Sequence, residues 1–110
     1  MAFYNHLWLI PSILVAPNIV RSPQSIIVTA GSDITLECRA TGDPIPTVRW
    51  VKNNQTASTV YPQVVSPGYG KLFIQYSNTA DNGSYQCQFT NIKGSIFSDP
   101  AVIAVVGKID

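Results

Sequence analysis

The placement of two cysteines on alternating segments most constrains the fold of this chain. Over residues 34–40, around Cys38, apolar and polar side chains alternate, which is typical of a strand with one face toward a core. Residues 85–89, around Cys87, show the same alternation. Three intervening strands are expected between the two cysteines, so they meet only if the sheet folds over into two layers. The pattern predicts an all-β, two-layer antiparallel sandwich with one disulfide between its sheets.

The predicted disulfide has one alternative. Closing a loop of about 50 residues would remove roughly 4 kcal/mol of chain entropy from the unfolded state. That is a large share of the stability of a small domain. The alternative interpretation is two reduced, buried cysteines in a cytosolic domain.

Composition favours strands over helices. Eight prolines and seven glycines are spread over the 110 residues, and no window of about 12 residues has helical periodicity. Short β-branched and aromatic runs alternate with turn residues instead. Residues 61–65 fit either one edge strand or two short ones. The other strands are expected at about residues 25–30, 34–40, 48–51, 71–75, 85–90 and, with a kink at Asp99-Pro100, 95–106.

The first sixteen residues differ from the rest of the chain. Their apolar stretch of about nine residues is too short for a membrane-spanning helix, which needs about 20. Its length and the small Ala16 predict a secretory signal peptide over 1–16, followed by one domain over 17–107. Against this, no Lys or Arg precedes the stretch, Pro11 interrupts it and Pro17 follows the cut. The alternatives are that part of the segment is a first strand packed on the domain, or that the start is truncated or mispredicted.

Several spaced motifs together resemble an immunoglobulin domain of the intermediate (I-set) type. The resemblance covers residues 17 to 106 and includes a tryptophan twelve positions after the first cysteine. The matching elements are Gly31, residues 36–46 (LECRATGDPIP), Trp50, Leu72-x-Ile74, Asp81-x-Gly83-x-Tyr85-x-Cys87 and Asn91-x-x-Gly94.

The resemblance assigns structural roles to several residues. It implies that Trp50 packs on the disulfide and that the Tyr85 hydroxyl bonds back to the preceding turn. Leu72 and Asp81 belong to the same structural set. Phe89 departs from the family, which usually has Ala or Val there, and this implies local repacking.

Charge and residue types exclude several functions. Charged residues make up 12% of the chain and the formal net charge is +1, against about 25% charged residues in an average soluble protein. Without a basic run, nucleic acid is not an expected partner. The single histidine, His6, lies in the predicted leader, and the aspartates are explained by turns or caps. We expect no enzyme activity, no catalytic or metal-binding residue, no cofactor and no small-molecule substrate.

Two glycosylation sequons and two contact surfaces are candidates. Asn54 and Asn82 begin Asn-x-Ser/Thr sequences in predicted loops, although Asn82 is also explained by its turn. One candidate contact surface is an outward sheet face, and the other is a hairpin tip. Both also fit an ordinary solvated face with scattered apolar residues. The first comprises Arg49, Val51, Gln86, Gln88, Val102 and Ala104, and the second Ile92, Lys93, Ile96 and Phe97.

These features favour an extracellular, non-catalytic module for protein recognition or cell adhesion. The leader, the sequons and the paired cysteines all agree with that location. The expected partners are other proteins, among them another immunoglobulin-like domain, and no membrane span is expected in this chain. The alternatives are a spacer domain from a tandem array of the matrix or muscle type, and a stand-alone secreted binder.

Overall fold

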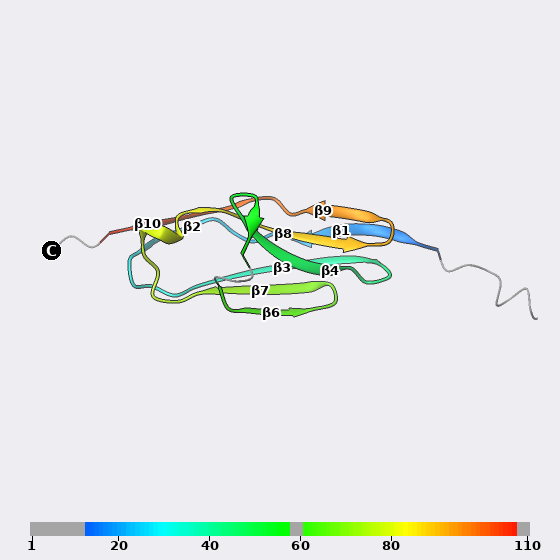
Figure 1. Ribbon diagram of the computed structural model, residues 1–110, viewed down its shortest axis with the longest axis horizontal. Coiled ribbons are helices and arrows are strands. Elements are labelled where there is room, and N and C mark those ends of the chain that lie inside the picture. The colour runs from blue at the N-terminus through cyan, green and yellow to red at the C-terminus, as the bar shows by residue number, and fades with distance from the viewer. Residues whose placement is uncertain (1–12, 58–60, 108–110) are drawn as a thin grey trace, which may run out of the picture.

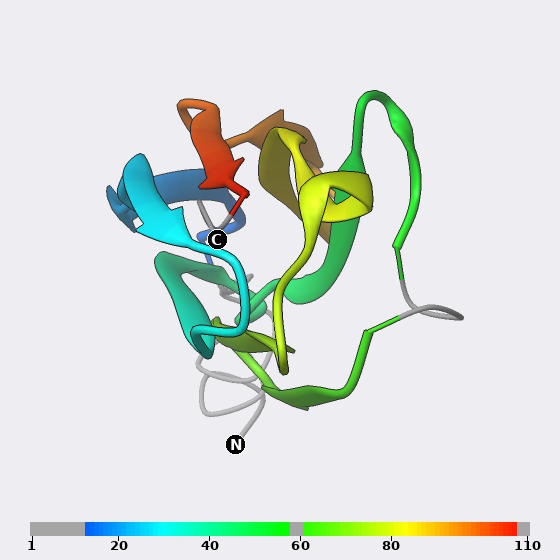
Figure 2. The same ribbon diagram turned by 90° about the vertical axis from the view of Figure 1, so that its left-hand side faces the viewer.

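The protein is an elongated sandwich of two β-sheets (Figure 1). The computed structural model describes residues 13–57 and 61–107, so most of the predicted leader, including His6, lies outside the described residues. Viewed along the long axis, the red β10 and the yellow β8 lie in one layer, and the blue-green β3 and the green β6 lie in the other (Figure 2). The two-layer all-β fold predicted from the sequence is confirmed.

One layer is a four-stranded sheet in the order β1-β3-β7-β6, with every pair antiparallel. The turn between β6 and β7 is Pro67-Gly68. Gly68 has φ +77°, a conformation that glycine adopts without steric cost. The strands are β1 (Val15–Arg21), β3 (Ile34–Asp43), β6 (Gln63–Ser66) and β7 (Tyr69–Ile74).

The other layer is a six-stranded sheet in the order β2-β10-β8-β4-β5, with β9 also paired to β8. Its pairs are antiparallel except β2 with β10, because β2 comes to this sheet from β1 of the opposite layer. The expected final strand over 95–106 is two strands, separated at Ser98-Asp99-Pro100. The strands are β2 (Ile26–Thr29), β4 (Thr47–Lys52), β5 (Gln55–Thr56), β8 (Gly83–Asn91), β9 (Gly94–Phe97) and β10 (Ala101–Val106).

Two segments differ from the expected elements. Composition favours strands over helices, but residues 79–81 form a short 3-10 helix, η1 (Thr79–Asp81). Of residues 61–65, only the last three belong to a strand, the edge strand β6. Tyr61, which precedes Pro62, is buried instead.

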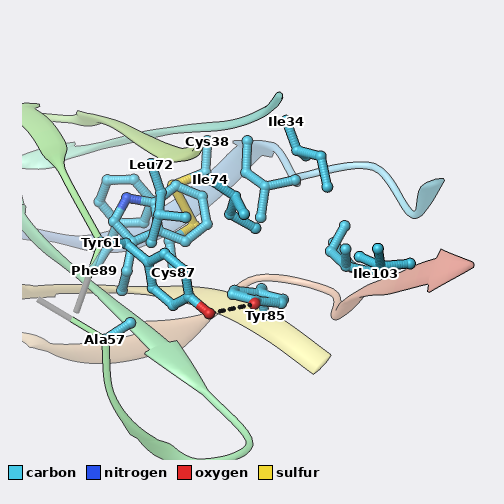
Figure 3. Packing of buried hydrophobic residues seen from close by; sticks show 14 of the residues in the cluster. Ile34, Cys38, Ala57, Tyr61, Leu72, Ile74, Tyr85, Cys87, Phe89 and Ile103 are labelled. Atoms are coloured by element: carbon cyan, nitrogen blue, oxygen red, sulfur yellow. Dashed lines mark hydrogen bonds between the residues drawn. A yellow bond between two sulfur atoms is a disulfide. The ribbon is translucent and has the colours of Figure 1, made fainter. Parts of the chain in front are cut away.

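The core lies between the layers and is filled from alternating positions of the long strands. In β3, the inward residues from Ile34 to Ala40 are buried and the outward ones are more exposed. The same period buries Leu72 and Ile74 on β7. Figure 3 shows these side chains around the disulfide. The buried cluster is Ile34, Leu36, Cys38, Ala40, Trp50, Ala57, Tyr61, Leu72, Ile74, Tyr85, Cys87, Phe89, Ala101, Ile103 and Val105.

Candidate functional site

The disulfide joins the two layers at the centre of the core. Cys38 on β3 and Cys87 on β8 form the bond, and both are fully buried. Trp50 lies opposite Cys87 in the β4–β8 register, and Gly70 lies opposite Cys38 in the β3–β7 register. A Cβ atom on Gly70 would lie 3.0 Å from Nε1 of Trp50. The tryptophan ring therefore fills the space above the glycine, and the predicted inter-sheet disulfide is confirmed.

A polar cluster closes one end of the core. The Tyr85 hydroxyl donates to the backbone carbonyl of Asp81 at 2.6 Å, in the geometry that the family resemblance implies. The hydroxyl oxygens of Tyr85 and Tyr61 lie 3.1 Å apart (Figure 3). Tyr61 donates to Oδ1 of Asp81 at 2.7 Å. Lys52 Nζ donates to the Tyr61 hydroxyl at 3.1 Å and to the Ala80 carbonyl at 2.7 Å.

The electrostatics of this cluster stabilise its neutral tyrosines. Burial raises the pKa of Tyr61, and the hydrogen bonds with Tyr85 and Asp81 raise it further. Burial also raises the pKa of Tyr85. Asp81 accepts a second hydrogen bond from the backbone N–H of Asn78 at 2.9 Å, within a capping box on η1. The cluster therefore has a structural role, since its groups are committed to one another.

Sequence reasoning missed Tyr61 as part of this cluster. The residue lies in the segment whose strand assignment was ambiguous, next to Pro62. The usable signal was an aromatic residue in a segment whose strand pattern was ambiguous. Its partners Asp81 and Tyr85 are distant in the sequence, so local alternation does not reveal the contact.

Val51 does not belong on the predicted contact surface. We expected its side chain to point outward, but it is only 2% exposed. In the sheet register Val51 is paired on both sides, with Thr56 of β5 and Gln86 of β8. The short strand β5 extends the sheet past β4, so Val51 is an interior position of the layer and not an edge.

The remaining polar residues of that face form a connected surface. The Arg49 guanidinium donates to Oε1 of Gln88 at 2.7 Å and to the Thr56 hydroxyl at 3.2 Å. The Gln86 amide donates to the Ser98 carbonyl at 2.9 Å. These contacts hold the side chains in place, so the surface is preorganised.

An apolar stripe borders this polar surface on β2 and β10. Ile27 is 75% exposed and Val102 is 55% exposed. Together with Ser25, Ile26 and Ala104, they line a shallow groove of about 560 Å³. Val102 and Ala104 were predicted to face outward, whereas Ile27 was not singled out. Alternation predicts which residues share a face, but only the pairing of β2 with β10 brings Ile27 beside them.

The predicted hairpin tip is accessible. Ile92, Lys93 and Phe97 are exposed, while Ile96 is half-buried and packs against the core. Phe97 lies opposite Gln88 in the β8–β9 register. The tip therefore continues the surface that carries Gln88.

The two sequon asparagines lie in different settings. Asn54 is exposed in the β4–β5 turn with φ 67°. Asn82 is also exposed, but its Oδ1 accepts a hydrogen bond from the Val105 backbone N–H at 2.5 Å. Asn82 thus links β10 to the turn before β8, whereas no side-chain hydrogen bond of Asn54 to another strand occurs among residues 13–57 and 61–107.

The described part of the chain shows no group of three or more His, Cys, Asp or Glu side chains that could hold a metal ion. No helix within residues 13–57 and 61–107 is long and apolar enough to cross a membrane. The described surfaces instead provide an area for contact with a partner, which consists of preorganised polar groups and an apolar stripe.

Comparison with known proteins identifies the family. The immunoglobulin domain family matches residues 16–91. Mouse (Mus musculus) hemicentin-2 is 41% identical over 83 residues, which are 76% of this chain and 2% of that protein. Human (Homo sapiens) vascular endothelial growth factor receptor 1 is 37% identical over 95 residues, which are 86% of this chain and 7% of the receptor. The chain therefore spans only a small part of each of these relatives.

Solved structures show the same fold. The structure of titin domains Z1Z2 in complex with telethonin has a TM-score of 0.77 and 32% sequence identity, and covers 84% of this chain and 49% of that one. The buried disulfide, the tryptophan beside it and the tyrosine that bonds back to its turn thus occur in a chain that matches one family in both sequence and structure. The chain belongs to the immunoglobulin domain family.

Proposed function

We propose that this domain is a non-catalytic extracellular recognition module that binds another protein through the outer face of its six-stranded sheet. The expected partner is itself a protein domain, with another immunoglobulin-like domain as the first class to test. The observation that carries the proposal is the exposed apolar stripe of Ile27 and Val102, on the same sheet as the hydrogen-bonded amides of Gln86 and Gln88.

The chemistry of this face suits a protein interface. Neither β2 nor β10 contains a charged residue, and the outward side chains of Gln86 and Gln88 on β8 are neutral amides. Protein interfaces are depleted of charge at their centre and carry hydrogen-bonding groups around apolar contacts. Exposed apolar patches with a polar border mark such sites.

The disulfide and the relatives support the extracellular location. Disulfides persist in oxidising compartments and are rare in the cytosol. One relative is a receptor by name. A free-thiol assay on secreted protein is expected to find Cys38 and Cys87 fully oxidised, whereas two free thiols would contradict this location.

A matched pair of substitutions tests the binding face. Val102 on the six-stranded sheet and Val64 on the four-stranded sheet are 55% and 54% exposed. Beads coated with the full chain are tested against a panel of immunoglobulin-domain ectodomains that includes the chain itself. We expect Val102→Asp to abolish binding and Val64→Asp to leave it unchanged.

The control separates binding from folding. Both variants place one charge at an equally exposed valine, so melting curves should show similar stabilities. Equal binding by the two variants, or selective loss with Val64→Asp, would assign recognition to a different face.

A second function, a spacer in a tandem array, is favoured by the likeness to titin domains Z1Z2. A spacer needs the core and the disulfide but no particular outer face. If the wild-type chain binds no ectodomain while force spectroscopy shows high resistance to unfolding, the spacer function replaces recognition.

We further propose that residues 1–16 are a leader and that the mature domain begins at Pro17. Val15 pairs with Asp43, and the Val15 carbonyl accepts a hydrogen bond from the Asn91 side chain at 2.8 Å. These two contacts support the alternative hypothesis, in which the end of this segment is part of a first strand of the domain. N-terminal sequencing of secreted protein should find Pro17 first, and a mature chain that retains Val15 would favour the strand.

A further inference from the structure

The outer face of the four-stranded sheet concentrates positive charge. The chain has seven Lys and Arg residues in total. Three of these lie on adjacent strands of this face: Arg21 on β1, Arg39 on β3 and Lys71 on β7. Arg21 is directly opposite Arg39 in the register. Like charges in such pairs destabilise a sheet, so the arrangement has a cost in the free protein that a bound anion would relieve.

A single carboxylate lies among these cations. Glu37 is opposite Lys71 in the register, and its Oε1 lies 4.0 Å from an Arg21 nitrogen. Its Oε2 accepts a hydrogen bond from the Tyr69 hydroxyl at 2.6 Å. That hydrogen bond lowers the pKa of Glu37, and the charges of Arg21, Lys71 and Arg39 lower it further. All three cations therefore act on one carboxylate, which leaves this cluster with a net charge of about +2 near neutral pH.

Two acidic residues outside the strands, Asp33 and Asp99, each line a groove that also includes Arg21. The four strands of the sheet contain only one more acid, Asp43. It ends β3 four positions beyond Arg39, about 13 Å away along the strand. Among the acids of the four strands, Glu37 is therefore the one that lies within the cluster.

Aromatic rings position two of the cations. The Arg39 guanidinium carbon lies 4.9 Å from the centre of the Tyr69 ring, and Lys71 Nζ lies 6.0 Å from the centre of the Phe73 ring. These contacts orient the charged groups over the sheet. They also cover ring faces that a protein partner would otherwise use as anchors.

We propose that Arg21, Arg39 and Lys71 form a binding site for a sulfated polysaccharide. A linear polyanion can lie across adjacent strands and place successive sulfates on cations that are spread over a sheet, without the apolar anchor that a protein interface needs. The site is on the opposite layer from the proposed protein-binding face, so the two ligands can bind together. Its biological setting depends on the proposed extracellular location, but the binding itself does not.

Calorimetry with a heparin-derived octasaccharide and the full chain tests the site. We expect binding that weakens steeply as salt increases, because exposed charges are screened. Arg39→Ala and Lys71→Ala should each weaken binding several-fold, and the double variant by at least about tenfold, or 1.4 kcal/mol. Arg49→Ala and Lys93→Ala, which remove cations from the other layer, should leave the affinity unchanged.

One variant is expected to gain affinity. Glu37→Gln removes the negative charge from the centre of the cluster, so binding of the octasaccharide should tighten several-fold. A folding defect would not produce this gain. Absence of octasaccharide binding, or equal losses with Arg49→Ala and Arg39→Ala, would overturn the proposal.

Two further ligands distinguish a sulfated polysaccharide from an acidic protein segment as the occupant of this site. A desulfated octasaccharide should not bind, and a polyglutamate peptide should bind more weakly than the sulfated sugar. Stronger binding of polyglutamate would assign the face to an acidic protein segment instead. Val102→Asp should retain octasaccharide binding, so a failure of this site and a failure of the proposed protein-binding face give different results.

Discussion

The outer faces of the two sheets differ in chemistry although both derive from the same alternation of side chains. The four-stranded face carries Arg21, Arg39 and Lys71 around Glu37. The β2–β10 part of the six-stranded face has no charged residue in its strands and exposes Ile27 and Val102. Inward positions must fit one shared core, whereas outward positions are free to differ, so the two faces of one small domain can serve different ligands.

The largest expected effect comes from removing the covalent link between the two layers. Replacing Cys38 and Cys87 together by Ala should lower the free energy of unfolding by roughly 4 kcal/mol, because the unfolded chain regains the entropy of a loop of about 50 residues. Urea unfolding followed by Trp fluorescence measures the change. A loss below about 1 kcal/mol would show that packing alone holds the two faces together.

The next largest loss of stability is expected from a substitution that tests how closely the two layers approach each other. Gly70→Ala would place a Cβ atom 3.0 Å from Trp50 Nε1 and 3.2 Å from a Val48 methyl carbon. Overpacking of this kind costs roughly 1–3 kcal/mol. Gly107→Ala is the control, since no atom lies within 4 Å of its added Cβ. Equal melting temperatures for the two variants would mean that the tryptophan ring can move away from β7.

A smaller effect concerns the end of the core where Tyr61 meets Asp81. Tyr61→Phe removes the hydrogen bond to the Asp81 carboxylate, and a bond to a charged group contributes about 1.5–3 kcal/mol. Chemical denaturation at pH 7 measures the loss. The control is Tyr76→Phe, because Tyr76 is highly exposed. Similar losses in the two variants would contradict the proposed role of the cluster.

The same cluster predicts that the stability of the protein depends on pH in the alkaline range. The pKa of Tyr61 is raised in the folded protein above its ordinary value of 10.0. Its contribution to stability is therefore complete below about pH 10 and is lost as the pH rises above that value, because the unfolded state ionises first. Stability measured from pH 8 to 11 should fall less steeply in Tyr61→Phe than in the wild type. Parallel curves would contradict the raised pKa.

The smallest effect is confined to the charged face. Tyr69→Phe removes the hydrogen bond that lowers the pKa of Glu37, so the pKa should rise toward its ordinary value while the fold is unchanged. NMR titration of the Glu37 carboxyl carbon measures the shift. If the pKa stays low, the cations and not Tyr69 control this carboxylate.

Most of the fold follows from local patterns. The alternation around Cys38 and Cys87 is confirmed because period-two patterning determines which residues face a core. The prediction for Val51 is wrong because alternation does not tell how many strands flank a position. The same limit hid Tyr61, whose partners Asp81 and Tyr85 are distant in the sequence. It also hid Ile27, whose neighbours on β10 are far away in the sequence.

By itself the sequence determined the all-β class, the inward residues of the long strands and the two cysteines that join the layers, because these depend on the spacing of side chains along one strand. Only the tertiary structure decided which outward residues become neighbours. Strand order joins Arg21, Arg39 and Lys71 into one charged face, and the parallel pairing of β2 with β10 joins Ile27 to Val102. These surfaces are built from residues distant in the chain, so strand pairing was needed to find them.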